Sequence, residues 1–139
     1  LSHIFKSPGH LSDNMIFISD YLCSWSSASS VYVGGTAGVD CSGFVCNVFD
    51  IPRLSTKDLL NCSYFDKIGD WKQGQQFDIL LKSGHVMILN DYKIDNNGQV
   101  VGCYVWESTT RDGVDQVLAN YHDATYAKDF QIYRFTDWQ

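Results

Sequence analysis

Residues 31–45 of this chain read VYVGGTAGVDCSGFV, and the interpretation of the remaining sequence depends on them. The glycine-rich first half favours turns. The second half predicts a buried helix, because apolar residues recur from Cys41 at positions i, i+3, i+4 and i+7. Asp40 is a preferred N-cap residue, so Cys41 is expected at the first helical position. The unpaired N–H groups and the helix dipole at that position favour a thiolate, and the stretch therefore predicts a nucleophilic cysteine.

Cys41 also has a purely structural interpretation. It lies on the apolar stripe of the expected helix, and free cysteine is among the most buried residue types. The helix alone does not decide between a nucleophile and a core residue, so the decision depends on the rest of the chain.

Composition limits the classes of protein to be considered. The chain has 139 residues, of which 45% are hydrophobic, and we expect a single domain over 1–139 with residues 1–12 as a surface lead-in. A net charge of −6 and a pI near 4.9 argue against binding to nucleic acid. No apolar run approaches the roughly 18 residues of a transmembrane helix. Because the chain begins with leucine, we interpret it as a processed protein or an excised domain.

The cysteine pattern predicts neither a metal site nor a cofactor. There are five cysteines and no C-x-x-C pair, so the spacing of a zinc site is absent. The odd number leaves at least one thiol free, which is compatible with a reactive cysteine. Disulfide pairing, cellular compartment and oligomeric state are not assigned by the sequence.

Helical signals dominate the first part of the chain. A first helix is expected from a cap at Ser12 or Asp13 to Trp25. The Cys41 helix should end near residues 50–51, because Pro52 cannot continue it. A capping box at residues 55–58 predicts a further short helix.

Strand signals dominate the second part. The predicted strands cover residues 77–81, 85–89, 99–106 and 132–135. Residues 61–76 are expected to form a long surface loop, and residues 114–118 fit either a strand or a helix. This order predicts an α+β fold in which N-terminal helices pack on an antiparallel sheet.

A nucleophilic cysteine needs a base, and His85 is the preferred candidate among four histidines. It opens an apolar strand and follows Gly84, which permits close approach of another backbone. His3 and His10 lie in the lead-in, and His122 lies in an expected surface segment, so these three are poor candidates. A single histidine at the start of a strand is more often structural than catalytic. A catalytic role for His85 therefore requires a further residue that orients its imidazole.

The expected β-hairpin supplies that partner. Residues 95–98 read DNNG, a strong turn signal, and facing residues around it should have numbers that sum to about 193–195. Glu107 then lies within one or two residues of the position opposite His85 and can orient the imidazole. Asp91 is the alternative, but six residues along the same strand it should be about 20 Å from His85.

Two blocks of sequence resemble a known family. The first is Gly34-Gly35 followed by DCSGFV at 40–45, and the second is GHVMI at 84–88. Their order and distance resemble the NlpC/P60 family of papain-like cysteine peptidases, and the resemblance covers roughly residues 31–110. It implies a catalytic triad of Cys41, His85 and, in the family's third position, Glu107.

The resemblance also implies a substrate and a location. Members of this family cleave peptide bonds in the stem peptides of bacterial peptidoglycan, often between D-glutamate and a diamino acid, and they act in the cell envelope or after secretion. It assigns substrate binding to Asp40 and Ser42, with Tyr32 one residue from the family's usual upstream tyrosine. A helix cap and a first-turn serine are equally good explanations of Asp40 and Ser42. The chain departs from the family pattern at Phe77, where glycine is common, and in using glutamate as the third residue.

Two other functions fit the same residues. The Cys41–His85 pair could serve an amidase, a deamidase or an acyltransferase that acts on another substrate. An inactive domain that binds cell-wall or protein ligands is the non-enzymatic alternative. The mass of the released fragment would separate the enzymes, and an unreactive Cys41 thiol would favour the binding domain.

Overall fold

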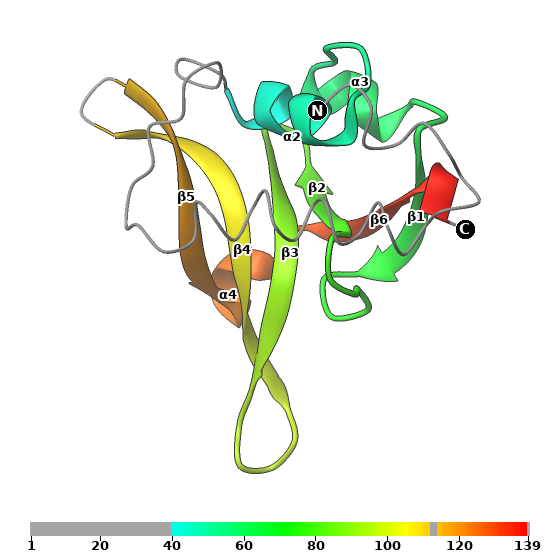
Figure 1. The fold of residues 1–139 in the computed structure, drawn as a ribbon. Coiled ribbons are helices and arrows are strands. Elements are labelled where there is room, and N and C mark those ends of the chain that lie inside the picture. Colours follow the sequence, from blue (N-terminus) through cyan, green and yellow to red (C-terminus); the bar gives the residue numbers. More distant parts are fainter. Residues whose placement is uncertain (1–39, 112–113, 139) are drawn as a thin grey trace.

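The computed structural model describes residues 40–111 and 114–138, and Figure 1 shows their arrangement. The helices and strands are α2 (Cys41–Phe49), α3 (Thr56–Leu60), β1 (Phe65–Asp70), β2 (Ile79–Lys82), β3 (His85–Ile94), β4 (Val100–Arg111), β5 (Val114–Asp123), α4 (Ala124–Ala127), β6 (Gln131–Phe135) and the 3-10 turn η2 (Thr136–Trp138). The strands form one antiparallel sheet in the order β1-β6-β2-β3-β4-β5. The predicted α+β class is therefore confirmed.

Helix α2 begins and ends where the sequence predicts. The Asp40 carboxylate accepts the Gly43 N–H at 2.8 Å, so Asp40 is the N-cap and Cys41 is the first helical residue. Asp50 ends the helix in the left-handed conformation with φ 54°, and its N–H bonds the carbonyls of Asn47 and Cys46.

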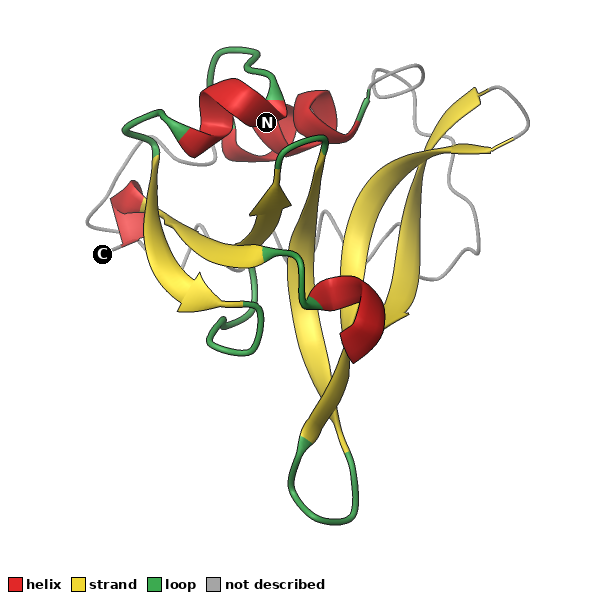
Figure 2. Cartoon of the chain, turned by 180° about the vertical axis from the view of Figure 1, so that it is seen from behind, coloured by secondary structure: helices red, strands yellow, loops and turns green. Residues whose placement is uncertain are grey.

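The sheet is covered on both faces (Figures 1 and 2). On one face, Phe44 and Phe49 of α2 pack against Val86 and Trp106 in the first buried cluster. On the other face, α4 and the segment after it pack against alternate residues of the same strands, which include Met87 and Val105. The apolar stripe of α2 and the alternating apolar residues of the strands thus form two buried clusters, one on each face of the sheet. This packing places the N-terminus of α2 near the start of β3.

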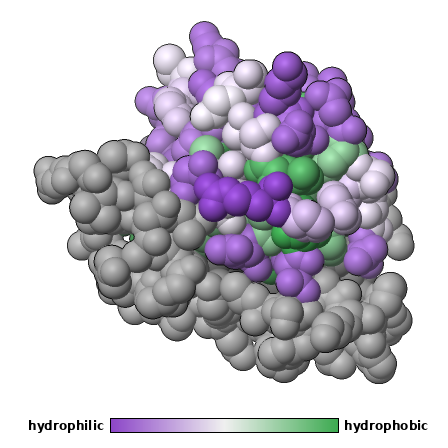
Figure 3. Space-filling view, turned by 90° about the horizontal axis from the view of Figure 1, so that it is seen from above, coloured by the Kyte–Doolittle hydropathy of each residue, from purple (hydrophilic) through white to green (hydrophobic). Residues whose placement is uncertain are grey.

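The end of the molecule that carries α2 and α3 is mainly polar. Seen from above, its described surface shows hydrophilic side chains around a small hydrophobic area (Figure 3). Helix α3 begins at the predicted cap, because the Ser55 hydroxyl accepts the Asp58 N–H at 3.1 Å. The Thr56 hydroxyl accepts the Gly84 N–H at 3.0 Å, which ties α3 to the turn that leads into His85.

Gly84 has a different role from the one that we expected. Among the described residues, an added Cβ would meet nothing within 4 Å, so no described backbone segment approaches closely. The residue instead has φ +96°, a conformation that favours glycine. Gly84 therefore permits the tight β2–β3 turn that places His85 at the start of β3.

The β3–β4 hairpin has the predicted register. The Gly98 N–H bonds the Asp95 carbonyl, and Ile88 faces Trp106 while Asp91 faces Tyr104, so the facing numbers sum to 194 or 195 on the two sides of a register shift. The hairpin extends well beyond the rest of the sheet (Figure 1). Strand β3 is longer than predicted because its polar residues up to Ile94 still pair with β4, and β4 is longer because residues 107–111 pair with β5.

Two expectations about the sheet were wrong or incomplete. Residues 61–76 do not form one long loop, because Phe65–Asp70 within them is strand β1. Only Phe65 of β1 is fully buried, and the polar remainder of this edge strand gives no clear strand signal. The ambiguous segment 114–118 is the start of β5, which pairs with β4 along its whole length.

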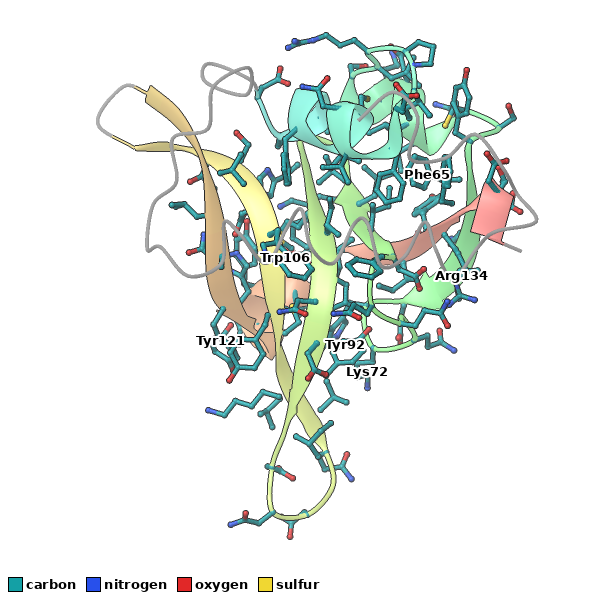
Figure 4. All side chains as sticks on the ribbon, viewed as in Figure 1. Phe65, Lys72, Tyr92, Trp106, Tyr121 and Arg134 are labelled. Carbon is teal, nitrogen blue, oxygen red and sulfur yellow. The ribbon has the colours of Figure 1, made fainter. Side chains whose placement is uncertain are left out.

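Phe77 explains one departure from the resembled family. It has φ 74°, in the left-handed region where glycine is favoured. Its buried ring stacks on Trp106 at 6.0 Å between centroids, and Figure 4 shows Trp106 at the centre of the sheet. The burial and stacking of the ring offset the backbone strain that a glycine would avoid.

Some predictions fall outside the described residues. They are the surface lead-in, the helix that ends at Trp25, and the glycine-rich turn before Asp40. Within residues 40–111 and 114–138, no helix has the length and apolar character needed to cross a membrane.

Candidate active site

A cleft of about 410 Å³ lies where the N-terminus of α2 meets the start of β3 and the adjoining parts of β4 and β5. Its lining includes Cys41, His85 and Glu107, the three residues that the sequence predicts as a triad. Asn120, His122 and Tyr126 line the same cleft. The fold therefore gathers side chains from α2, β3, β4, β5 and α4 around one space.

The surroundings of the Cys41 thiol lower its pKa. It is half-buried at the start of α2, and burial by itself raises its pKa. Hydrogen bonds from the His85 side chain and the Val86 N–H, together with the charge of His85, oppose that effect, and the net result is a lowered pKa. Asp40 next to it acts weakly in the opposite direction.

His85 lies between the thiol and a carboxylate. Its Nε2 is 2.6 Å from Oε1 of Glu107, which leaves Nδ1 for the Cys41 thiol. Burial lowers the pKa of the imidazole, but the hydrogen bonds to Cys41 and Glu107 and their charges raise it to about 9. A lowered thiol pKa beside a raised imidazole pKa favours a thiolate–imidazolium pair near neutral pH.

Glu107 is a buried carboxylate, with only 1% of its side chain exposed. Burial alone would raise its pKa, but hydrogen bonds from His122, His85 and Asn120 lower it to about 2. Glu107 is therefore ionised under ordinary conditions and acts as an acceptor only. The predicted Glu107–His85 contact is confirmed.

His122 is the residue that sequence reasoning missed. It does not lie in a peripheral surface segment but on β5, half-buried, where its Nε2 hydrogen-bonds Oε2 of Glu107. Its ring stacks on Tyr126 at 4.1 Å between centroids. Asn120, two residues earlier on the same strand, donates to the same oxygen at 3.0 Å.

A signal for His122 is present in the sequence. Asp112-Gly113 is a favoured two-residue hairpin sequence, and a turn centred on it makes facing numbers sum to 225. That register places Glu107 opposite Leu118, as observed, and puts Asn120 and His122 on the same face of the neighbouring strand. The signal is weak by itself, because residues 114–118 fit a helix as well as a strand.

The predicted substrate-binding residues have structural roles in the described chain. Oδ1 of Asp40 accepts the Ser42 hydroxyl at 3.3 Å and forms an ion pair with Arg53 at 3.2 Å. Ser42 is buried, whereas Asp40 is exposed and lines the cleft. Tyr32 lies outside the described residues. Asp91, the alternative orienting residue, is exposed, and the cavity that it lines does not include His85.

The other described cysteines differ from Cys41. Cys46, Cys62 and Cys103 are free thiols, and burial raises the pKa of Cys103 to about 11, with Glu107 adding to the effect. Burial likewise raises the pKa of Cys46. In the part of the chain that the structure describes, no group of three or more His, Cys, Asp and Glu side chains is arranged to hold a metal ion.

Comparison with known proteins adds no relative. No family model matches the sequence, no curated protein matches it, and no solved structure matches the fold. The chemistry of the cleft therefore has to be inferred from its own side chains.

Proposed function

We propose that this protein is a cysteine hydrolase with an NlpC/P60-like, papain-like fold that cleaves peptide bonds in peptidoglycan stem peptides. The observation that supports this most directly is the connected set of hydrogen bonds from the Cys41 thiol through His85 to the buried Glu107. In this arrangement Cys41 is the nucleophile, His85 transfers protons and Glu107 orients His85.

The proposed reaction has two steps. The Cys41 thiolate attacks the carbonyl carbon of the scissile bond, and the resulting oxyanion is stabilised by the Cys41 N–H at the helix N-terminus. The His85 imidazolium then gives a proton to the leaving amine, which departs as a thioester forms. In the second step, His85 accepts a proton from water, the hydroxide attacks the thioester, and the acid product leaves as the thiol is regenerated.

The substrate class rests on two lines of support. The blocks DCSGFV at 40–45 and GHVMI at 84–88 resemble those of peptidases that act on stem peptides. The Asp40 carboxylate lies at the edge of the cleft and suits an amino group of such a peptide. A location in the bacterial cell envelope or outside the cell follows from the same proposal.

Replacement of the nucleophile tests the proposal. We expect Cys41→Ala to reduce release of fragments from synthetic stem peptides by about 1000-fold or more, measured by mass spectrometry. Cys62→Ala is the matched control, because Cys62 is a free thiol that lies outside the cleft, and it should keep the wild-type rate. Circular dichroism verifies that each variant is folded.

Two outcomes would contradict the proposal. A folded Cys41→Ala protein that retains wild-type turnover would exclude the mechanism. If wild type cleaves no stem peptide but Cys41 is activated, the substrate class is wrong, and the fragment released from other amides identifies the reaction.

A further inference from the structure

We propose that His122 is a positioning residue, which holds the Glu107 carboxylate so that one of its oxygens faces His85. This inference rests on the proposed function and extends it by a fourth residue. His122 belongs to β5, the edge strand that pairs with the strand of Glu107 on the side away from His85.

The two oxygens of Glu107 have separate partners. Oε1 is 2.6 Å from Nε2 of His85, and Oε2 accepts from Nε2 of His122 and, at 3.0 Å, from Nδ2 of Asn120. A carboxylate with both oxygens engaged cannot rotate without breaking bonds on both sides. The contacts on Oε2 therefore fix the direction in which Oε1 points.

The protonation of the cluster sets the direction of each hydrogen bond. Glu107 is ionised and only accepts, so Nε2 of His85 and Nε2 of His122 both donate. The buried anion is stabilised by three donors, and two of them are imidazoles that line the cleft. His122 is thus as close to the charge of the triad as His85 is.

The orientation of the His122 ring has a second, independent support. The ring lies almost parallel to the Tyr126 ring, at 19°, with centroids 4.1 Å apart. Tyr126 comes from α4, and the ammonium of Lys82 lies 5.8 Å from its ring centroid. Packing against Tyr126 of α4 is therefore consistent with the orientation of the imidazole towards Glu107 and is a contact separate from the hydrogen bond.

Other ionisable groups surround the cluster and belong to several elements. Cys41 of α2 hydrogen-bonds His85. The negative charge of Glu107 contributes to the raised pKa of Cys103 on β4, and the charges of Glu107 and Cys41 contribute to the raised pKa of Tyr126 on α4. Burial raises the pKa of the Cys103 and Tyr126 side chains, so both stay neutral near pH 7. The pH dependence of Cys41 alkylation should therefore arise from the Cys41–His85 pair.

Two substitutions separate the hydrogen bond from the ring stacking. His122→Phe keeps a ring against Tyr126 but removes the N–H donor, whereas His122→Gln keeps a donor near the position of Nε2 but removes the ring. The assay is the rate at which iodoacetamide alkylates Cys41 between pH 5 and 9, followed on the Cys41 peptide by mass spectrometry. It needs no substrate.

We expect His122→Phe to slow alkylation at pH 6 by about three- to tenfold, because the carboxylate loses the bond that keeps Oε1 directed at His85, and the misplaced carboxylate stabilises the His85 imidazolium less. His122→Gln should recover most of the wild-type rate. In a Glu107→Gln background, His122→Phe should have no further effect, since its action passes through the carboxylate.

The outcomes distinguish this inference from the proposed function. An ordinary, slow Cys41 thiol in wild type would overturn the proposed function itself. A reactive wild-type thiol with an unchanged rate in His122→Phe would overturn the role of His122 alone. An equal loss in the presence and absence of the Glu107 carboxylate would also overturn it. If His122→Phe does not fold, His122→Asn replaces it, because the shorter amide cannot reach Glu107 and the same loss is expected.

Discussion

Two buried carboxylates, Asp78 immediately before β2 and Glu107 on β4, have different kinds of hydrogen-bond partner. Asp78, which is fully buried, receives two hydrogen bonds of 2.9 Å from the Arg134 guanidinium and a third from the Gln75 N–H. Glu107, also buried, is bonded by two histidines and an asparagine. Arg134 lies at the β6 side of the sheet, away from β4 and β5 (Figure 4).

The partners explain why one carboxylate is structural and the other belongs to a reactive site. Arginine is always charged, so the Asp78–Arg134 pair cannot exchange a proton near neutral pH. An imidazole can accept and release a proton, and both histidines around Glu107 line an open cleft. A buried acid therefore indicates chemistry when its partners can titrate and solvent can reach them.

The largest expected effect on stability comes from breaking the first pair. Asp78→Asn should lower the free energy of unfolding by about 3 kcal/mol, because it removes the buried negative charge that accepts two hydrogen bonds from the Arg134 guanidinium. Glu107→Gln should cost only about 1 kcal/mol, since neutral imidazoles can still bond an amide. Urea denaturation at pH 7 measures both values.

The reactivity of Cys41 should respond in the reverse order, with the larger effect in Glu107→Gln and none in Asp78→Asn. Folded Asp78→Asn protein should alkylate Cys41 at the wild-type rate, and Glu107→Gln should not. An equal loss of stability in the two variants would show that the Glu107 cluster is a structural ion pair like the first.

A smaller effect is expected on the pH dependence of stability. Hydrogen bonds to Cys41 and Glu107 raise the pKa of His85 from 6.5 to about 9, so these contacts stabilise the fold fully below pH 6.5, and the stabilisation is lost as the pH rises through about 9. A Cys41→Ala background removes the titrating thiol together with its share of this shift and leaves the part due to Glu107, so stability should fall by about 1–2 kcal/mol between pH 6.5 and 9.

The control for that measurement is the double variant with His85→Gln. It should show a flatter profile over the same range, because the other titrating groups are common to both proteins. Identical slopes would mean that His85 is not paired with Glu107 in solution.

The smallest effect concerns the rings that connect the two regions. Phe77 precedes Asp78 in the chain, Trp106 precedes Glu107, and their rings are stacked. Phe77→Leu should cost about 1 kcal/mol through loss of this stacking, and the pH profile of Cys41 alkylation should not change. A changed profile would mean that the two regions are coupled through the core.

Local signals in the sequence predict much of this arrangement. The caps at Asp40 and Ser55 act within one turn of helix, and the hairpin at residues 95–98 fixes its own register, so none of them needs tertiary information. The register of that hairpin is also sufficient to predict that Glu107 lies near His85.

The missed features depend on contacts that are distant in sequence. Strand β1 is mostly polar and exists because it pairs with β6, more than 60 residues later. His122 gains its partner only when β5 pairs with β4. Polar residues occur at both odd and even positions of β5, so the sequence alone does not indicate which side faces Glu107. Likewise, the left-handed backbone at Phe77 is stabilised by the stacking of its ring on Trp106.

The most direct test of the central claim is the rate of Cys41 alkylation against pH in wild type, His85→Ala and Glu107→Ala. We expect rapid labelling of wild type with an apparent pKa well below the value of about 8.5 for a free thiol. His85→Ala should return that pKa towards 8.5, and Glu107→Ala should move it in the same direction by less. A wild-type thiol that labels slowly and is unaffected by either substitution would mean that Cys41 is a core residue and not a nucleophile.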